Sequence, residues 1–155
     1  MLTCLRVDHR LLHGQVAFSW TSALNADCIL IANDHVVNDD LRKTTMKMAK
    51  PNGVKLVMKS IEDSIQAFNS GVTDKYHLFI VVESIQDAYD LVKNTNIKKI
   101  NLGGTKATSE TRNISKAVNV TEKETALLKE LIQSGVDVEI QMVPEDVVIK
   151  ADKVL

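Results

Sequence analysis

Apolar residues in this chain form short runs that alternate with segments of helical periodicity. Strand-length runs rich in Val, Ile and Leu occur at residues 2–7, 28–32, 54–58, 77–82, 99–102 and 136–142. Between them, apolar residues recur every three or four positions, which predicts helices over 14–24, 38–50, 61–70, 85–94 and 122–134. Alternating strands and helices with short connections indicate parallel strands joined by right-handed crossovers. We therefore expect an open α/β fold, with a mainly parallel, twisted sheet of about six to seven strands and helices on both faces.

Capping residues support the predicted helix boundaries. Ser60 and Ser84 stand where N-caps are needed, Asn38 is expected to cap the second helix, and Thr121 with Glu124 forms a capping box. Two predicted helices have apolar faces that should be buried: Val16, Ala17, Trp20, Ala23 and Leu24 in the first, and Leu41, Thr45, Met48 and Ala49 in the second. The segment 105–120 breaks the alternation and adds either a short strand or a loop, and the tail after Pro144 has no clear pattern.

Length and charge restrict the class of protein. The chain has 155 residues, the usual size of one domain, so we expect a single domain over 1–155. Its 19 basic and 20 acidic residues give a net charge of −1, which argues against binding to nucleic acid or to an anionic membrane surface. No apolar run is long enough to span a bilayer, and the first residues lack a signal-peptide layout. Cys4 and Cys28 lie in apolar runs, as expected of buried free thiols in the reducing cytoplasm.

One loop holds most of the reactive side chains. Open α/β sheets bind ligands beyond the carboxyl ends of their strands, here the loops at 8–13, 33–35, 59–60, 83–84 and 103–109. Of these, 8–13 contains Asp8, His9, Arg10 and His13, with Arg6 just before it. No metal-ligand cluster accompanies them. This loop is therefore the candidate site.

His13 stands where the first helix begins. A neutral imidazole is a competent nucleophile, and the N-terminus of a helix offers unpaired N–H groups and a positive dipole end that favour a phosphoryl dianion. An arginine adds charge-assisted hydrogen bonds of about 1.5–3 kcal/mol each. Arg10 is the first choice for this clamp, Gly14 allows close backbone approach, and Asp8 orients either Arg10 or the His13 ring. Arg6 either reaches the site or anchors Asp8 and the loop.

The string from Arg6 to Val16, RVDHRLLHGQV, closely resembles the signature of the IIB component of the mannose/fructose/sorbose family of the bacterial sugar phosphotransferase system (PTS). The resemblance continues through Trp20, residues 31–36 and residues 100–104, and so covers essentially the whole chain. It implies a free-standing IIB domain with a mainly parallel sheet. It also implies phosphorylation of His13, through Nδ1, by a phosphohistidine of the IIA protein. The phosphoryl group then passes to a sugar held by the membrane components IIC and IID, so the chain would be a cytoplasmic phosphotransferase attached to the membrane through its transporter.

A transfer of this kind needs negative charge neutralised around the phosphorus. Further donors are expected from backbone N–H groups of the loop, namely those of Leu11, Leu12, Gly14 and Gln15. Candidates for supporting groups lie in neighbouring loops: Asn33 and Asp34, expected beside the first strand, and Gly103 and Gly104. The arginines and amides already supply positive charge, so we expect no metal and no other cofactor.

A different function for the same anion site is a module that binds a sugar phosphate or nucleotide without covalent change. A receiver-type signalling module is disfavoured, because the third strand ends in Lys59 and Ser60 rather than in an acidic acceptor. The sugar, the oligomeric state (a homo-oligomer included) and the roles of His9, His35 and segment 105–120 stay open. His9 inherits no role, since its position varies in the family motif.

Overall fold

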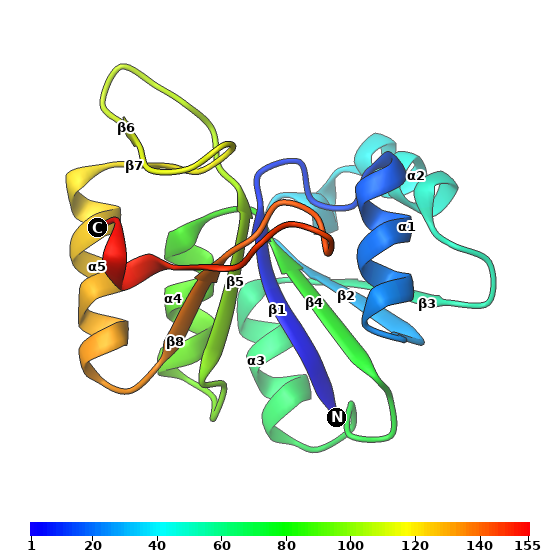
Figure 1. The fold of residues 1–155 in the computed structure, drawn as a ribbon. Coiled ribbons are helices and arrows are strands. Elements are labelled where there is room, and N and C mark those ends of the chain that lie inside the picture. The colour runs from blue at the N-terminus through cyan, green and yellow to red at the C-terminus, as the bar shows by residue number, and fades with distance from the viewer.

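The computed structural model describes residues 1–14 and 17–155; Gln15 and Val16 lie outside the described residues. Its main sheet has seven strands in the order β3-β2-β4-β1-β5-β8-β9, all parallel except β9 (Figure 1). The strands are β1 (Leu2–Asp8), β2 (Cys28–Ala32), β3 (Lys55–Lys59), β4 (Leu78–Val82), β5 (Lys99–Gly104), β8 (Asp137–Ile140) and β9 (Ile149–Lys150). The predicted fold class is confirmed.

Helices cover both faces of the sheet and create two separate cores. The helices are α1 (Gly14–Ala23), α2 (Asp40–Ala49), α3 (Ile61–Asn69), α4 (Ile85–Lys93) and α5 (Glu122–Gln133). In Figure 1, α1 and α2 lie on one side of the sheet and α3, α4 and α5 on the other. One apolar cluster includes Trp20 of α1 and Met46 of α2, whereas the other includes residues of α3, α4 and α5. This two-sided cover explains why β2 and β4 are apolar throughout.

The capping signals locate most helix starts correctly, but α2 differs. Ser60, Ser84 and the Thr121 capping box act as predicted. In contrast, Asn38 ends a short 3-10 turn (Val36–Asn38), and Asp39 caps α2 by accepting from the amide of Arg42. A cap shifted by one residue is a small change for the backbone.

The predicted buried face is wrong for α2, whereas in the described part of α1 it is confirmed except at Ala23. Leu41 and Met48 of α2 are 77% and 83% exposed, and Met46 is buried instead. Ala23 of α1 is also exposed, while Ala17 and Trp20 are buried. Because α2 is largely polar, its few apolar positions do not determine which side faces the sheet, and tertiary packing decides.

Small strands form in segment 105–120, where a short strand or a loop was expected, and in the tail after Pro144, which had no clear pattern. Segment 105–120 contains β6 (Arg112–Asn113) and β7 (Asn119–Val120), which pair with each other only. After β8, residues 141–148 form a loop that we call the strap, and the chain returns as β9 and a 3-10 turn (Ala151–Lys153). Figure 1 shows the strap passing in front of β1 and β5 near their carboxyl ends.

The topology places a crevice between β1 and β5. From β1 the chain crosses toward β2, whereas from β5 it continues toward β8, so adjacent strands leave in opposite directions. Such a switch point opens a ligand site at the carboxyl edge of the sheet. The pairing partner of Asp8 there is Gly104, and Gly103 is an extra residue in β5 where the register shifts.

Candidate functional site

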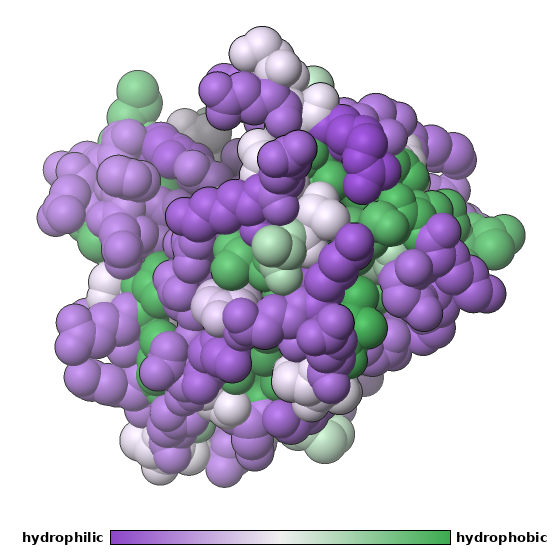
Figure 2. Space-filling view, turned by 90° about the vertical axis from the view of Figure 1, so that its left-hand side faces the viewer, coloured by the Kyte–Doolittle hydropathy of each residue, from purple (hydrophilic) through white to green (hydrophobic). Residues whose placement is uncertain are grey.

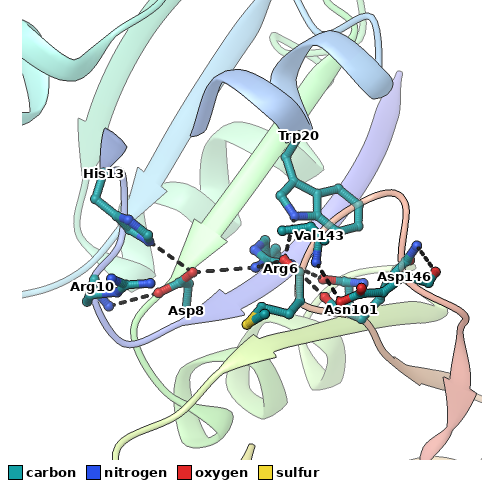
Figure 3. A network of polar contacts seen from close by, with 10 residues as sticks. Arg6, Asp8, Arg10, His13, Trp20, Asn101, Val143 and Asp146 are labelled. Atoms are coloured by element: carbon teal, nitrogen blue, oxygen red, sulfur yellow. Dashed lines mark hydrogen bonds and ion pairs between the residues drawn. The ribbon is translucent and has the colours of Figure 1, made fainter. Parts of the chain in front are cut away.

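His13 lies at this edge and caps the N-terminus of α1. Its backbone is extended (φ −152°, ψ 144°), and its carbonyl accepts from the amide of Ala17. The ring Nε2 lies 3.2 Å from Oδ2 of Asp8, and the His13 side chain is 22% exposed (Figure 3). The contact occupies Nε2 and leaves Nδ1 as the other ring nitrogen. His13 therefore combines a fixed orientation with access to solvent.

The loop before His13 is held in an unusual conformation. Leu11 has φ 58°, in the left-handed region, at a typical cost of about 1–2 kcal/mol for a residue with a side chain. Leu11 and Leu12 are both buried in the core beneath α1. Burial of two leucine side chains stabilises by roughly 3–6 kcal/mol, so it offsets this cost. The two buried leucine side chains thus attach the loop to the apolar core.

Asp8 is the centre of the polar contacts. Its Oδ1 accepts from the backbone amide of Arg10 at 3.0 Å, and its Oδ2 faces both His13 and Arg6. Burial alone would raise the pKa of Asp8, but the hydrogen bonds from His13 and the Arg10 amide, together with the charge of Arg6, outweigh burial and lower that pKa. Asp8 is consequently a carboxylate at neutral pH and can only accept hydrogen bonds.

Arg10 is exposed, in contrast to Asp8. Among the described residues, its guanidinium makes no ion pair or hydrogen bond. Figure 3 draws Arg10 and His13 on the same side of Asp8. An exposed, uncommitted arginine beside a partly exposed histidine is suited to binding a phosphoryl group.

Arg6, by contrast, points into the protein and is 2% exposed. Its guanidinium lies 3.5 Å from Asp8 Oδ2 and also donates to Asn101 and to the strap. Of the two roles left open by the sequence, the geometry gives Arg6 that of anchoring Asp8. The reason is that residues 6 and 8 lie on the same face of β1, so the carboxylate stands between the guanidinium and His13.

The backbone amides of the loop differ in availability. The N–H of Leu11 donates to the Asp8 carbonyl at 2.9 Å, which closes a turn, so Leu11 does not serve as predicted. The amides of Leu12, His13 and Gly14 have no acceptor among the described residues. The predicted role of Gln15 lies outside the described residues. Unpaired amides at a helix N-terminus provide a ready site for an anion.

Comparison with known proteins identifies the family. Residues 2–155 match the family model described as the PTS system sorbose subfamily IIB component. The chain belongs to this family. It is 35% identical to the sorbose-specific EIIB component of Lacticaseibacillus casei, over 94% of this chain and 90% of that protein. It is 45% identical to a probable phosphotransferase enzyme IIB component of Streptococcus pyogenes serotype M6, over 60% of this chain and 57% of that protein.

A solved structure gives the same result. The crystal structure of the IIBSor domain of the sorbose permease from Klebsiella pneumoniae superimposes with a TM-score of 0.91 and 28% identity, covering 97% of this chain and 93% of that chain. The predicted family and the phosphocarrier function that belongs to it are confirmed. This IIB component is a phosphotransferase in the general sense.

The candidate supporting residues Asn33 and Asp34 of the IIB component do not adjoin the loop. We expected their segment beside the first strand, but β4 lies between β1 and β2. Asn33 Oδ1 accepts from the amides of His35 and Val36, and Asp34 Oδ1 accepts from that of Ile61. Their side chains stabilise the turn after β2 and the start of α3.

The glycines after β5 do lie at the site, with a different use from the one expected. A Cβ at Gly103 would come within 2.0 Å of Arg6 Cζ, so Gly103 makes room for a buried guanidinium. The Gly104 carbonyl accepts from the amide of His9 at 3.0 Å and joins the β1 loop to β5. Neither arrangement requires a phosphoryl group.

Sequence reasoning missed the contribution of the strap and of two residues facing it. Trp20 is buried as expected, but its indole N–H also donates to the Met142 carbonyl at 3.0 Å. Asn101 accepts from Arg6 at 2.6 Å. A buried tryptophan needs an acceptor for its N–H, so the sequence could have indicated that Trp20 has one. Nothing in the neighbouring sequence indicates that this acceptor is a backbone carbonyl 122 positions away.

Metal-binding clusters and membrane-spanning helices are both absent from the described residues of the IIB component. Within them, no three His, Cys, Asp or Glu side chains are grouped so that they could hold a metal ion. No helix in that part of the chain has the length and apolar character needed to cross a membrane.

Proposed function

We propose that His13 is the phosphoryl acceptor of this IIB component and that Nδ1 forms the bond to phosphorus. The Nδ1 lone pair attacks the phosphorus of a phosphohistidine on a IIA protein, the donor P–N bond breaks, and the donor imidazole keeps that electron pair. In the second step a sugar hydroxyl attacks the phosphorus, the bond to His13 breaks with its electron pair returning to Nδ1, and the hydroxyl proton passes to water. No net redox change occurs in either step.

The observation that carries this proposal is the contact between His13 Nε2 and Asp8 at 3.2 Å. Because Asp8 is a carboxylate that only accepts, the proton of a neutral His13 ring resides on Nε2. The lone pair then resides on Nδ1. Arg10 and the amides of Leu12, His13 and Gly14 supply positive charge for the equatorial oxygens.

The partners follow from the reaction. We propose a IIA protein as donor and membrane components IIC and IID as holders of the sugar, with the IIB chain acting as one domain over residues 1–155. The related sorbose-specific EIIB component of Lacticaseibacillus casei supports a PTS context. The chain then works at the cytoplasmic face of the membrane and is held there by its transporter.

The direct test replaces the acceptor. His13→Ala should abolish labelling by a phosphorylated IIA protein, whereas His77→Ala, an exposed histidine at the opposite edge of the sheet, should label at the wild-type rate. The modified residue should be acid-labile, base-stable and mapped as Nδ1-phosphohistidine. Labelling of His13→Ala would refute the assignment, and the absence of any label on a wild-type chain that binds a sugar phosphate tightly would favour the non-covalent module.

The clamp is tested by Arg10→Lys. Lysine keeps the charge but loses the two-pronged donor geometry, so we expect phosphoryl uptake to slow by roughly 10- to 100-fold. Arg112→Lys is the matched control, because Arg112 of β6 is also exposed but its guanidinium donates to the Val154 carbonyl. An Arg10→Lys rate equal to that of the wild type would remove Arg10 from the mechanism.

A further inference from the structure

Two hydrogen bonds from different parts of the chain converge on the backbone carbonyl of Met142 in the strap. Arg6 Nη2 donates to it at 2.8 Å, and the Trp20 indole Nε1 donates at 3.0 Å (Figure 3). Arg6 is on β1, on the same face as Asp8, and Trp20 lies about two turns after His13 on α1. The Met142 carbonyl therefore links the strand that carries Asp8 to the helix that begins at His13.

The guanidinium of Arg6 is fixed from several directions. Its Nη1 donates to Asn101 Oδ1 at 2.6 Å and to the Gln141 carbonyl at 3.0 Å. The guanidinium carbon lies 4.7 Å from the centre of the Trp20 ring, a cation–π contact. On the β5 side it fills the space left by Gly103. These contacts leave one orientation for the guanidinium.

The buried guanidinium of Arg6 lowers the stability of the fold relative to an apolar side chain at the same position. A buried charge carries a large desolvation cost, and among the described residues Arg6 Nε has no hydrogen-bond partner. An apolar side chain packed beneath Trp20 would avoid both costs. A cation at this position has a function if it fixes the Asp8 carboxylate. Oδ2 of Asp8 lies 3.5 Å from Arg6 Nη2 and 3.2 Å from His13 Nε2.

We propose that the strap is part of the phosphoryl-transfer site, with Arg6 and Trp20 as positioning residues that act through Asp8. Held by the Met142 carbonyl, they keep the carboxylate directed at Nε2 of His13. The ring then stays in the tautomer that bears hydrogen on Nε2, and Nδ1 keeps the lone pair that attacks phosphorus. This inference rests on the proposed role of His13 and adds what sets the reactive nitrogen.

Loss of either contact should change the tautomer of His13. Without the Arg6 contact, Asp8 has one fewer fixed donor and can rotate about its side-chain torsions. Without the Trp20 N–H, α1 loses its polar link to the strap. In either case the imidazole is free to carry its proton on Nδ1, where it blocks attack and directs phosphorus to Nε2.

Two variants test the proposal. In Arg6→Lys, a single ammonium replaces a fork that reaches four acceptors, and we expect kcat for uptake from phosphorylated IIA to fall about 10- to 100-fold. In Trp20→Phe, an aromatic ring remains beside Arg6 but the smaller side chain cannot donate to the Met142 carbonyl, so a fall of about 3- to 10-fold is expected. KM for phosphorylated IIA should stay constant in both, since neither side chain is at the surface.

The decisive readouts are ones that a merely structural role would not move. Nitrogen-15 NMR of the unphosphorylated variants should show His13 shifting toward the tautomer with hydrogen on Nδ1, and the phosphorylated variants should contain Nε2-phosphohistidine. The matched control is Thr21→Val, because Thr21 is also buried in α1 and its hydroxyl has no partner among the described residues. Its tautomer ratio and kcat should equal those of the wild type.

The outcomes separate the two proposals. Wild-type tautomer ratio and kcat in a folded Trp20→Phe would overturn the role of the strap, even if Arg6→Lys failed to fold. Labelling of His13→Ala would instead overturn the acceptor assignment, and it would do so without reference to the strap. The NMR measurement needs no phosphoryl donor, so it reports on positioning whether or not transfer occurs.

Discussion

At the scale of single residues, the site depends on which oxygen of Asp8 faces which donor. The amide of Arg10 holds Oδ1, so Oδ2 is directed at His13. An asparagine at position 8 would keep Oδ1 toward the Arg10 amide and place its NH2 group against His13 Nε2. That group can only donate, so it selects the tautomer with hydrogen on Nδ1.

Asp8→Asn is therefore expected to reduce phosphoryl uptake by roughly 10²- to 10⁴-fold, as for other histidines whose orienting carboxylate is replaced by an amide. The initial rate of labelling by phosphorylated IIA measures the effect. Asp40→Asn, an exposed carboxylate in the first turn of α2, should have no effect. If Asp8→Asn retained more than half of the wild-type rate, the carboxylate would not set the tautomer.

The residues of the loop could be predicted because they are contiguous and follow a buried strand. The sequence places Asp8, Arg10 and His13 together at the carboxyl edge without any knowledge of strand order. The direction of Arg6 could not be predicted in the same way. It depends on the empty space at Gly103 and on carbonyls of the strap, and a sequence contains no local record of either.

At the scale of elements, several carboxylates lie close together around the first turn of α4. The pKa of Asp87 is raised to about 6; burial is the main cause, the neighbouring carboxylates of Asp34, Asp90 and Glu83 add to it, and a hydrogen bond from Ser84 opposes it. A folded-state pKa above the unfolded value of about 3.9 means that the native protein binds the extra proton. The free energy of unfolding should therefore fall as pH rises from about 4 to about 6, and then level off.

Asp87→Asn should remove this slope and leave the variant at least as stable as the wild type at pH 7, because it carries no buried charge. Urea unfolding at several pH values between 4 and 7 measures the difference. Asp63→Asn, exposed in the first turn of α3, should keep the wild-type slope. The lowered pKa of Asp8 acts in the opposite direction and only below about pH 4, since the stability it contributes is lost as its carboxylate is protonated.

Element boundaries could be predicted wherever a cap accompanies strong periodicity, as at Ser60 and Thr121. The orientation of α2 could not, because a polar helix at the margin of a sheet leaves the choice of face to its neighbours. The short strands β6, β7 and β9 contain two residues each, too few for any alternation to be recognised.

At the scale of the whole molecule, the site is built at the centre of the sheet. β1 is flanked by β4 and β5, and its apolar residues contribute to the core on the side of α3, α4 and α5. The apolar surface in Figure 2 lies in separate patches among polar ones on the face that carries α5. Strand order follows from long-range pairing, so the insertion of β4 between β1 and β2 could not be predicted from the alternation alone.

This arrangement predicts a gradient of local stability. Backbone amides of β1, β2 and β4 should exchange with solvent only on global unfolding, since these strands are paired on both sides. Amides of β6, an exposed strand that pairs only with β7, should exchange at least about 10²-fold faster by local opening. Native-state hydrogen exchange followed by NMR measures both. Equal protection in β6 and β4 would contradict the gradient.

The contact between Arg6 and Met142 joins positions 136 apart in the sequence. Because translation runs from the N-terminus to the C-terminus, the ribosome synthesises His13 well before it synthesises the strap. A nascent chain or a truncated fragment that stops before the strap thus contains the complete motif, but the tautomer of its His13 ring is not yet fixed. If the strap sets the reactive nitrogen as proposed, the protein gains the ability to carry phosphorus only after the strap has folded against β1 and α1.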